Sequence, residues 1–303
     1  MLEKARHFVE YICLATIVFA ARLFAFETAI NFSSKVAVFA YYFIPIRKSY
    51  VLKAMRLSFP NKHPEEIKTI AKNMYKNFLR TIVEIIFFPT MSDEQLQKLM
   101  IIENEHLIDE ALSKNNGGII MSAHFGNWEL TALSFSKKYP LSVIVANQSN
   151  KFIDSMIDKI RTKQGFNTIS RDNRPAKKIF KALNRNELVA ILADQDAGKN
   201  GIFIPFLDRL SSMPRGPALF AIRAKCPVIV ALGIRQDDGV MRVTFFETPN
   251  FDTGNIENDI RLINTFYAKK LEEFILKAPQ QWFWFHKKWK TQPRLKTRKL
   301  IKR

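Results

Sequence analysis

From about residue 100 onward, short apolar runs alternate with longer stretches in which apolar residues recur at helical spacing. Short, nearly all-apolar runs between amphipathic segments are typical of strands in a parallel sheet that helices cover on both faces. The pattern therefore predicts one α/β body with a largely parallel, mixed sheet. The expected strands span residues 118–123, 141–146, 167–170, 188–193, 202–206, 227–234 and 240–246, and the expected helices lie near 127–138, 150–164, 174–185, 214–225 and 258–277.

Residues 49–100 have a pattern that predicts helices instead. Pro64 and the acidic pair Glu65 and Glu66 mark the start of the longest one, because proline and negative charge both favour the first helical turn. Apolar side chains then recur at helical spacing. These are Ile67, Ile70, Met74, Phe78, Ile82, Ile85 and Ile86.

The beginning of the chain holds two apolar stretches that predict a membrane anchor. Residues 8–26 are nearly long enough to cross a bilayer, but Glu10 and Arg22 interrupt them. A second stretch at residues 36–44 is followed by basic residues. Two incomplete apolar segments with basic flanks indicate a helix pair in one leaflet, or one tilted anchor. A pair of buried core helices is the alternative.

These patterns divide the chain into two expected parts. Residues 1–48 form the anchoring segment, and residues 49–303 form one domain, helical over 49–100 and α/β over 101–303.

The net charge of +19 implies an anionic partner. Nucleic acid, an acidic membrane surface, a phosphorylated substrate and an acidic protein all fit that charge. Cys13 and Cys226 are the two cysteines of the sequence, and they form no CxxC pair. This excludes a disulfide framework or a cysteine-rich zinc site, and it suits a reducing compartment.

Three polar residues follow directly after expected strands: His124, Arg171 and Asp194. In a parallel sheet, ligands bind at the carboxyl ends of the strands, so these side chains are expected at one edge. That convergence predicts a functional site.

His124 and Glu129 are five residues apart, so on one helix they would point roughly 140° from each other. They can meet if His124 lies in a turn and Glu129 in the helix that follows. Gly126 suits the bend, and Asn127 suits the N-cap of that helix. His124 is then expected to act as a general base and Glu129 to orient it. No serine or cysteine is placed as a covalent nucleophile, which favours direct attack by a substrate hydroxyl on an activated acyl carbon.

The bare spacing of His124 and Glu129 is weak evidence, because roughly half a match of this kind is expected by chance in such a chain. A lone histidine at the end of a strand is also often structural.

The residue types of the other candidates indicate a function less clearly. Arg171, with Arg174 close by, suits a phosphate group or a solvated loop. Asp194 and Asp196 form a D-x-D pair, but without a further carboxylate cluster we do not expect a metal there. No phosphate-binding glycine fingerprint supports nucleotide binding.

Residues 279–303 combine three of the four tryptophans with a dense run of lysine and arginine. Aromatic residues beside cations suit a membrane–water interface or an anionic headgroup, and they also suit single-stranded nucleic acid. A charge run is often a solvated tail, so only residues 282–289 are expected to have a functional role, with His286 packed or interfacial.

Taken together, these motifs resemble those of the lipid A biosynthesis late acyltransferases, a branch of the lysophospholipid acyltransferase superfamily. The resemblance covers essentially the full length and includes the apolar anchor. It rests on "SAHFGNWE" for the H-x4-[D/E] motif, "GFNTISR", "LADQDAG", "PVIVALGIR" and the C-terminal "PQQWFWFHKKWKTQPR". The third block of the wider superfamily carries a glutamate-glycine pair where this chain has "DQDAG", which puts the role of Asp194 in doubt.

The resemblance implies a glycerolipid acyltransferase-like fold and the transfer of a fatty acyl chain from acyl carrier protein to a hydroxyl of a Kdo-bearing lipid A precursor. It implies an inner-membrane location with the catalytic domain on the cytoplasmic face, an anionic glycolipid acceptor, no cofactor and no nucleic acid.

Carried onto this sequence, His124 would be the general base and Glu129 its partner. Arg171 would bind an acceptor phosphate or stabilise developing negative charge, with Arg174 as a helper, and Asp194 would contribute to substrate binding. Because a helix is expected to begin at this turn, the backbone N–H groups of Gly126 and Asn127 are also expected to stabilise the oxyanion. The alternatives are acylation of another glycolipid or a lysophospholipid, and, more remotely, a membrane-tethered basic protein that binds nucleic acid or acts as a scaffold.

Overall fold

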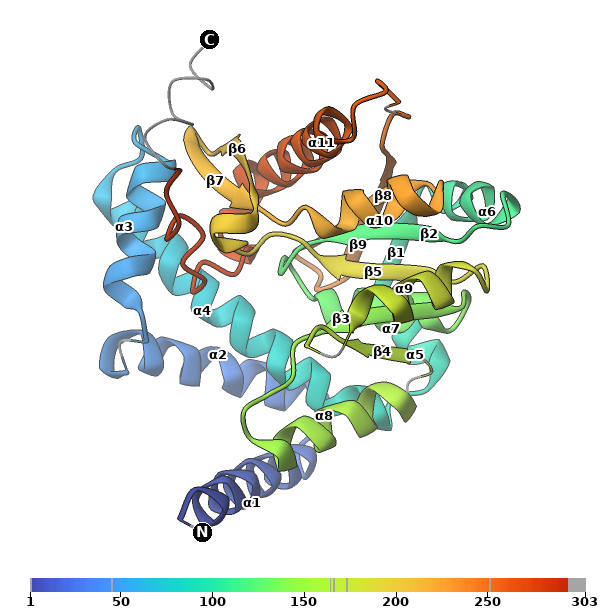
Figure 1. Cartoon of the computed structure of the whole chain (residues 1–303). Coiled ribbons are helices and arrows are strands. Elements are labelled where there is room, and N and C mark those ends of the chain that lie inside the picture. Colours follow the sequence, from blue (N-terminus) through green and yellow to red (C-terminus); the bar gives the residue numbers. More distant parts are fainter. Residues whose placement is uncertain are drawn as a thin grey trace.

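The computed structural model describes residues 2–44, 46–163, 165, 167–172, 174–250 and 252–293 (Figure 1). The basic run at residues 294–303, interpreted above as part of a solvated tail, lies outside the described residues.

A seven-stranded sheet forms the centre of the molecule, in the order β1-β9-β8-β2-β5-β3-β4. Neighbouring strands are parallel, except that β8 and β9 are antiparallel, so the prediction of a largely parallel, mixed sheet is confirmed. The strands are β1 (Met100–Glu103), β2 (Gly118–Ser122), β3 (Leu141–Val145), β4 (Asn167–Ser170), β5 (Leu188–Leu192), β8 (Val228–Arg235) and β9 (Met241–Glu247).

The expected strand at residues 202–206 does not join this sheet. As β6 (Ile202–Phe206), it pairs with β7 (Arg209–Met213) in a separate antiparallel hairpin. Leu207 and Asp208 connect the two strands, and both have positive φ angles of 48° and 58°. A two-residue turn of this conformation matches the twist of a hairpin, which explains why the chain folds back here.

Helices cover both faces of the sheet, because successive residues of each strand point to opposite sides. Ile119 and Met121 of β2 face a core shared with α9 (Pro175–Leu183), α10 (Gly216–Ala224) and α11 (Ile256–Lys277). Ile120 faces a second core shared with α6 (His106–Ser113) and α7 (Trp128–Ser136). The expected double covering of the sheet is therefore present.

Helices fill the region between the apolar beginning of the chain and the sheet. They are α3 (Lys48–Ser58), α4 (Pro64–Phe87) and α5 (Asp93–Lys98), and α8 (Lys151–Lys163) follows β3. Pro64 is the first residue of α4, and its N-terminus has a capping box formed by His63 and Glu66. The long central helix thus begins where the sequence predicts.

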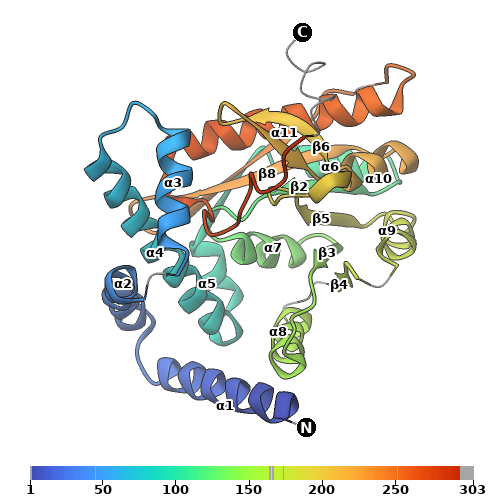
Figure 2. The ribbon, with the colours of Figure 1, turned by 60° about the vertical axis from the view of Figure 1, so that its left-hand side comes forward.

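The two apolar stretches at the beginning of the chain form α1 (Leu2–Arg22) and α2 (Phe26–Phe43) at one edge of the molecule (Figures 1 and 2). Arg22 donates to the carbonyl of Ile86 near the end of α4, at 2.9 and 2.7 Å from Nε and Nη2. The side chain of Asn150, just before α8, donates to the carbonyl of His7 at 2.8 Å. α1 is therefore tied to the body at both of its ends.

α2 presents small side chains to the protein and large apolar ones to the outside. Ala29, Ser33 and Ala37 are buried at helical spacing, whereas Phe32 and Phe39 are 65% and 55% exposed. Within the described residues, no single helix combines the length and apolarity of a membrane span; α2 and α3 meet that test only together, as a pair bent by 94°. The outward faces of this helix pair are not part of a protein core.

The tryptophans near the C-terminus contradict the interfacial interpretation of residues 282–289. Trp282 and Trp284 are 2% and 1% exposed and pack in the main core, with their ring centroids 4.7 Å apart. The indole N–H of Trp284 donates to the carbonyl of Pro279 at 2.7 Å. A tryptophan whose polar N–H finds a protein partner can be fully buried, so Trp282 and Trp284 are core residues rather than interfacial ones.

Candidate active site

The pairing of β2 with β5 brings two distant polar residues together. In the parallel register Ser122 lies opposite Leu192, so the positions two residues further on, His124 and Asp194, emerge side by side at the carboxyl edge. The sequence predicts that both follow strands, but only the strand order makes them neighbours.

His124 and Asp194 form a close pair. Nδ1 of His124 lies 2.8 Å from Oδ1 of Asp194, and the backbone N–H of His124 donates to Oδ2 at 3.1 Å. The indole N–H of Trp282 donates to the same Oδ2 at 2.9 Å. Trp128 and Phe283 flank the imidazole, with ring centroids 5.1 and 5.8 Å away. The imidazole is therefore held at one nitrogen, with Nε2 remaining for chemistry.

Asp194 is ionised at any pH near neutrality. Burial by itself would raise its pKa, but His124, the hydrogen bond from Trp282 and the charge of Lys288 together lower that pKa to about 2. An ionised carboxylate only accepts hydrogen bonds, so Nδ1 of His124 must carry a proton. Neutral His124 then has its lone pair on Nε2, which is the form a general base requires.

Lys288 is a fully buried lysine whose charge helps to lower the pKa of Asp194. Its Nζ donates to the carbonyls of Gln195 and Ser212 at 3.1 and 3.0 Å. Burial lowers the pKa of Lys288 to about 7, although Asp194 and Asp196 act in the opposite direction. Lys288 thus fixes the loop after β5.

The turn after His124 has the shape that the sequence predicts. Gly126 has φ of 58°, and a Cβ there would lie 2.6 Å from the carbonyl oxygen of Gly233, so only glycine fits. The side chain of Asn127 accepts from the N–H of Leu130 at 2.9 Å and caps α7. The predicted glycine bend and asparagine N-cap are both present.

The expected oxyanion role of Gly126 does not fit this turn. Its N–H donates to the carbonyl of Gln281 at 3.0 Å, so it is not free for a ligand. The C-terminal segment pairs with the turn here, and the sequence alone does not reveal that pairing.

Glu129 contacts Arg161 rather than His124. Nε of Arg161 donates to Oε2 of Glu129 at 3.2 Å, and its Nη2 donates to Oε1. The expectation that Glu129 orients His124 is corrected by this geometry, because Asp194 already occupies the imidazole's Nδ1. Glu129 lies in the first turn of α7, where it faces α8 and holds an arginine beside His124's cavity.

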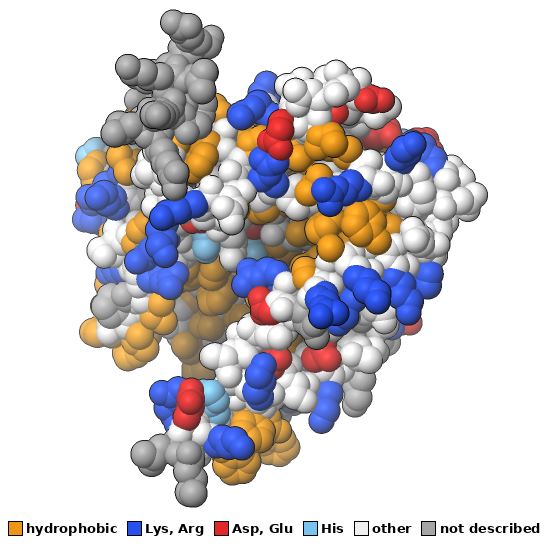
Figure 3. Space-filling model, viewed as in Figure 1, with side chains coloured by type: hydrophobic (Ala, Val, Ile, Leu, Met, Phe, Trp, Pro, Cys, Tyr) orange, Lys and Arg blue, Asp and Glu red, His pale blue; other side chains and the backbone are white. Residues whose placement is uncertain are grey.

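A cavity of about 660 Å³ opens beside His124. Its lining includes Glu129, Arg161 and Arg171. One branch runs between α7 and the sheet and is lined by apolar side chains of that core: Ile120, Ala132, Phe135, Leu141, Val143, Ala190 and Ala231. Figure 3 shows a hollow on this face of the molecule with hydrophobic side chains inside it and Lys and Arg side chains around it. The cavity therefore joins an apolar channel to a cationic mouth.

The two arginines proposed for phosphate binding lie differently. Arg171 lines the cavity at the end of β4, with its side chain 65% exposed and 3.6 Å from Asp172. Arg174 is the exposed N-cap residue of α9 and is not among the residues that line the cavity. Only Arg171 is in place to meet a ligand there.

Three residues around the site escape the sequence reasoning: Arg161, Trp282 and Lys288. Arg161 belongs to an amphipathic helix without any motif. Trp282 and Lys288 lie in the segment that the sequence favours as interfacial. The tryptophan-rich C-terminal motif, which resembles that of the late acyltransferases, indicated that this segment has a role. It did not show which residues Trp282 and Lys288 contact.

Comparison with known proteins agrees with this geometry. The sequence model of the bacterial lipid A biosynthesis acyltransferases matches residues 2–291. The chain is 23% identical to the lipid A biosynthesis palmitoleoyltransferase of Escherichia coli (strain K12), over 86% of this chain and 84% of that protein.

Two further relatives differ in what they acylate. The lipid A biosynthesis lauroyltransferase of Escherichia coli (strain K12) is 23% identical, over 83% of this chain and 81% of its own. The phosphatidylinositol mannoside acyltransferase of Mycolicibacterium smegmatis (strain ATCC 700084 / mc(2)155) is 22% identical, over 76% and 74%. With a histidine–carboxylate pair beside an apolar cavity and a family match over nearly the whole chain, this protein belongs to the bacterial lipid A biosynthesis acyltransferase family.

Proposed function

We propose that this acyltransferase moves a fatty acyl chain from acyl carrier protein to a hydroxyl of a Kdo-containing lipid A precursor. The observation that carries the proposal is the His124–Asp194 pair at the mouth of an apolar cavity. The apolar branch under α7 suits an acyl chain, and the cationic mouth suits an anionic glycolipid.

In the proposed reaction, Nε2 of His124 takes the proton of the acceptor hydroxyl while the hydroxyl oxygen attacks the thioester carbonyl. A C–O ester bond forms, the C–S bond breaks, and the proton passes from Nε2 to the leaving thiolate. Asp194 holds the tautomer and stabilises the imidazolium that forms. In this proposal, the backbone N–H of Trp128, at the start of α7, faces the developing oxyanion.

Arg161 and Arg171 bind acidic groups of the acceptor in this proposal. Glu129 keeps Arg161 in place beside the cavity rather than acting on His124. Both arginines offer planar donors that suit phosphate or carboxylate groups. The net charge of +19 supports the same class of substrate and an acidic carrier protein.

We propose that α1 and α2 hold the enzyme at the inner membrane, with the catalytic domain on the cytoplasmic face. Large apolar side chains are exposed along both helices and the turn between them: Phe8, Val9, Ile12, Ile17, Phe19, Leu23, Phe24, Phe32, Val36, Phe39, Tyr42 and Phe43. An exposed apolar surface of this extent suits the acyl region of a bilayer.

A second acceptor class is supported by the mycolicibacterial relative, whose name describes a phosphatidylinositol mannoside acyltransferase. The test offers the purified protein acyl carrier proteins loaded with different chains, together with either a Kdo-bearing lipid A precursor or a phosphatidylinositol mannoside. We expect mass spectrometry to find the acylated lipid A precursor. Acylation of the mannoside alone would move the assignment to the second class, and no transfer to either acceptor would refute the proposal.

A further inference from the structure

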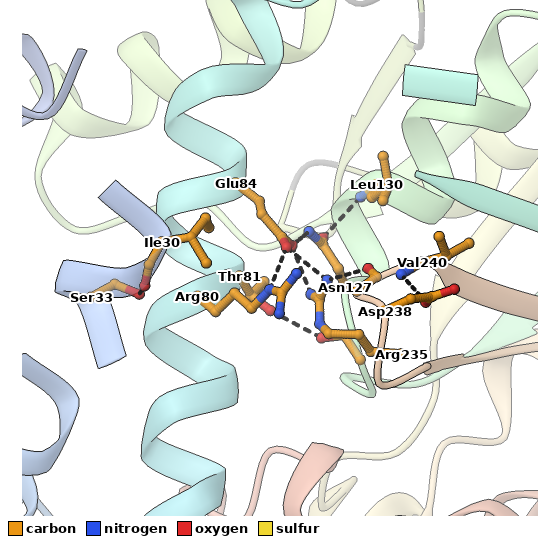
Figure 4. A network of polar contacts seen from close by, with 12 residues as sticks. Ile30, Ser33, Arg80, Thr81, Glu84, Asn127, Leu130, Arg235, Asp238 and Val240 are labelled. Carbon is orange, nitrogen blue, oxygen red and sulfur yellow. Dashed lines mark hydrogen bonds and ion pairs between the residues drawn. The ribbon is translucent and has the colours of Figure 1, made fainter. Parts of the chain in front are cut away.

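A buried charge network lies on the far side of the turn that follows His124 (Figure 4). Glu84 of α4 is 2% exposed, and both of its oxygens lie 2.7 Å from the guanidinium of Arg235, which is 7% exposed. Arg80 adds a contact of 3.0 Å from Nε. Burying charges carries a large desolvation cost, so a network like this is weak evidence for stability.

The network ends on the catalytic turn. Nδ2 of Asn127 donates to Oε2 of Glu84 at 2.6 Å, while Oδ1 of the same fully buried side chain caps α7. One turn earlier on α4, Thr81 donates to the carbonyl of Gly126 at 3.1 Å. α4 thus holds two successive residues of the turn. The amide of Asn127 donates to Glu84 through its nitrogen and accepts from Leu130 through its oxygen at the same time.

The same network reaches the turn from a second direction. Gln281 forms two bonds of 2.8 Å with the backbone of Arg235, one in each direction. The carbonyl of Gln281 accepts from Gly126, and the N–H of Phe283 donates to the carbonyl of His124 at 3.0 Å. Arg235 therefore joins Glu84 to the segment that clamps the other side of the turn.

We propose that Glu84 is a positioning residue for the acyl transfer. Through Asn127 and Arg235 it fixes the turn at residues 124–127, and so aligns Nε2 of His124 with the N–H groups at the start of α7. The inference rests on the proposed function of His124. Glu84, Asn127 and Arg235 do not line the cavity, so their effect passes through the turn and not through the substrate.

The test compares Glu84→Gln, Asn127→Asp and the double variant Glu84→Gln/Asn127→Asp. Asn127→Asp sets a carboxylate against Glu84. The double variant restores the single negative charge of the network, now at position 127, and allows one hydrogen bond between positions 84 and 127. Glu187→Gln is the matched control, because Glu187 is also buried and paired with an arginine, Arg185, but lies at the amino end of β5.

We expect each single variant to lower kcat about ten-fold or more with little change in KM, since small misplacements of a base have large effects. The double variant should recover most of this loss, and Glu187→Gln should keep the wild-type kcat. Amide hydrogen exchange should rise at Gly126 and Leu130 in Glu84→Gln and fall back in the double variant. The double variant keeps the net buried charge of the wild type. Its kcat therefore still tests the inference if Glu84→Gln alone folds poorly.

Wild-type kcat and unchanged exchange in Glu84→Gln would overturn the inference, and so would additive losses in the double variant. A wild-type enzyme without acyl transfer would instead refute the proposed function. The exchange data would still show whether Glu84 fixes the turn.

Discussion

At the scale of single residues, the chemistry depends on which partner His124 has. Asp194 is 70 residues away in the chain, yet it accepts from both the backbone and the side chain of His124. Its low pKa means that Asp194 stays charged near neutral pH. A fixed negative charge at Nδ1 favours the imidazolium that general-base catalysis produces.

Lys288 gives the first prediction, which concerns pH. Its pKa of about 7 in the folded protein is below the ordinary value of 10.5 that it regains on unfolding. Between these two values the unfolded chain binds more protons, so stability should rise with pH, by at most about 1.4 kcal/mol per pH unit. The wild-type protein should therefore gain stability relative to Lys288→Met as the pH rises from 7 to 9.

Urea unfolding of both proteins at pH 7, 8 and 9 measures this difference. Groups that do not interact with Lys288 contribute equally to both proteins and cancel, and Asp194 stays ionised throughout this pH range. If the difference in unfolding free energy between the two proteins is the same at pH 7, 8 and 9, the titration of Lys288 does not contribute to the pH dependence.

The choice between Glu129 and Asp194 shows what local sequence reasoning can reach. Spacing correctly ruled out a shared helix face for His124 and Glu129, and Gly126 and Asn127 revealed the turn. The partner of His124 depends on β2 and β5 being neighbours in the sheet. That is a long-range pairing, and no property of residues 122–129 encodes it.

At the scale of elements, α7 has two tasks. Its N-terminus carries Trp128 and Glu129 at the cavity mouth, and its body covers the apolar branch with Ala132 and Phe135. Small residues on the facing strands, Ala190 of β5 and Ala231 of β8, leave the space for a chain. In the function proposed above, the acyl chain occupies this branch, and the depth of the branch would then set the length of chain that fits.

Filling this branch should change the preferred donor. Ala190→Leu adds volume to the sheet side of the channel, so the ratio of kcat/KM for a long to a short acyl donor should fall about ten-fold. Competition between donors of two lengths, followed by mass analysis of the product, measures the ratio. Ala221→Leu is the control, because Ala221 is a buried alanine of α10 that does not line the cavity. An unchanged ratio in Ala190→Leu would mean that the chain lies elsewhere.

Most elements follow from periodicity, and the exceptions have reasons. The seven expected strands all exist, with ends within a residue or so of the prediction. The sequence pattern did not predict β1, because "MIIE" is short and follows directly on helices. It did not predict β7, because "RLSSM" is polar. The separate hairpin depends on the left-handed conformation of Leu207 and Asp208, which are not typical residues for such a turn.

At the scale of the whole molecule, α4 connects the outward-facing helices to the site. It packs against α2, accepts the hydrogen bonds of Arg22 of α1 at the carbonyl of Ile86, and contacts the turn after His124 through Thr81. α4 therefore contacts both the apolar helices at the beginning of the chain and the turn beside the cavity. The sequence predicted an apolar beginning of the chain, but it gave no indication that α4 links it to His124.

The outward-facing apolar side chains of α1 and α2 should determine membrane binding. The triple variant Phe32→Ser, Phe39→Ser, Phe43→Ser removes three outward rings, so binding to vesicles of anionic phospholipid should weaken at least about 100-fold. Flotation with increasing lipid measures the partition. Ile256→Ser with Leu276→Ser is the control, because both residues are exposed on α11 instead. Equal losses in the two variants would argue against a specific lipid-facing edge.

The most direct test of the central claim is the rate of acyl transfer to the lipid A precursor in four proteins: wild type, His124→Ala, Asp194→Asn and Glu129→Gln. Loss of the base or of its partner should lower kcat about 10²- to 10⁴-fold, whereas Glu129→Gln should act mainly on KM for the acceptor, because it frees Arg161. Full activity in His124→Ala would contradict the account. A wild-type rate in Asp194→Asn together with loss of kcat in Glu129→Gln would return the orienting role to Glu129.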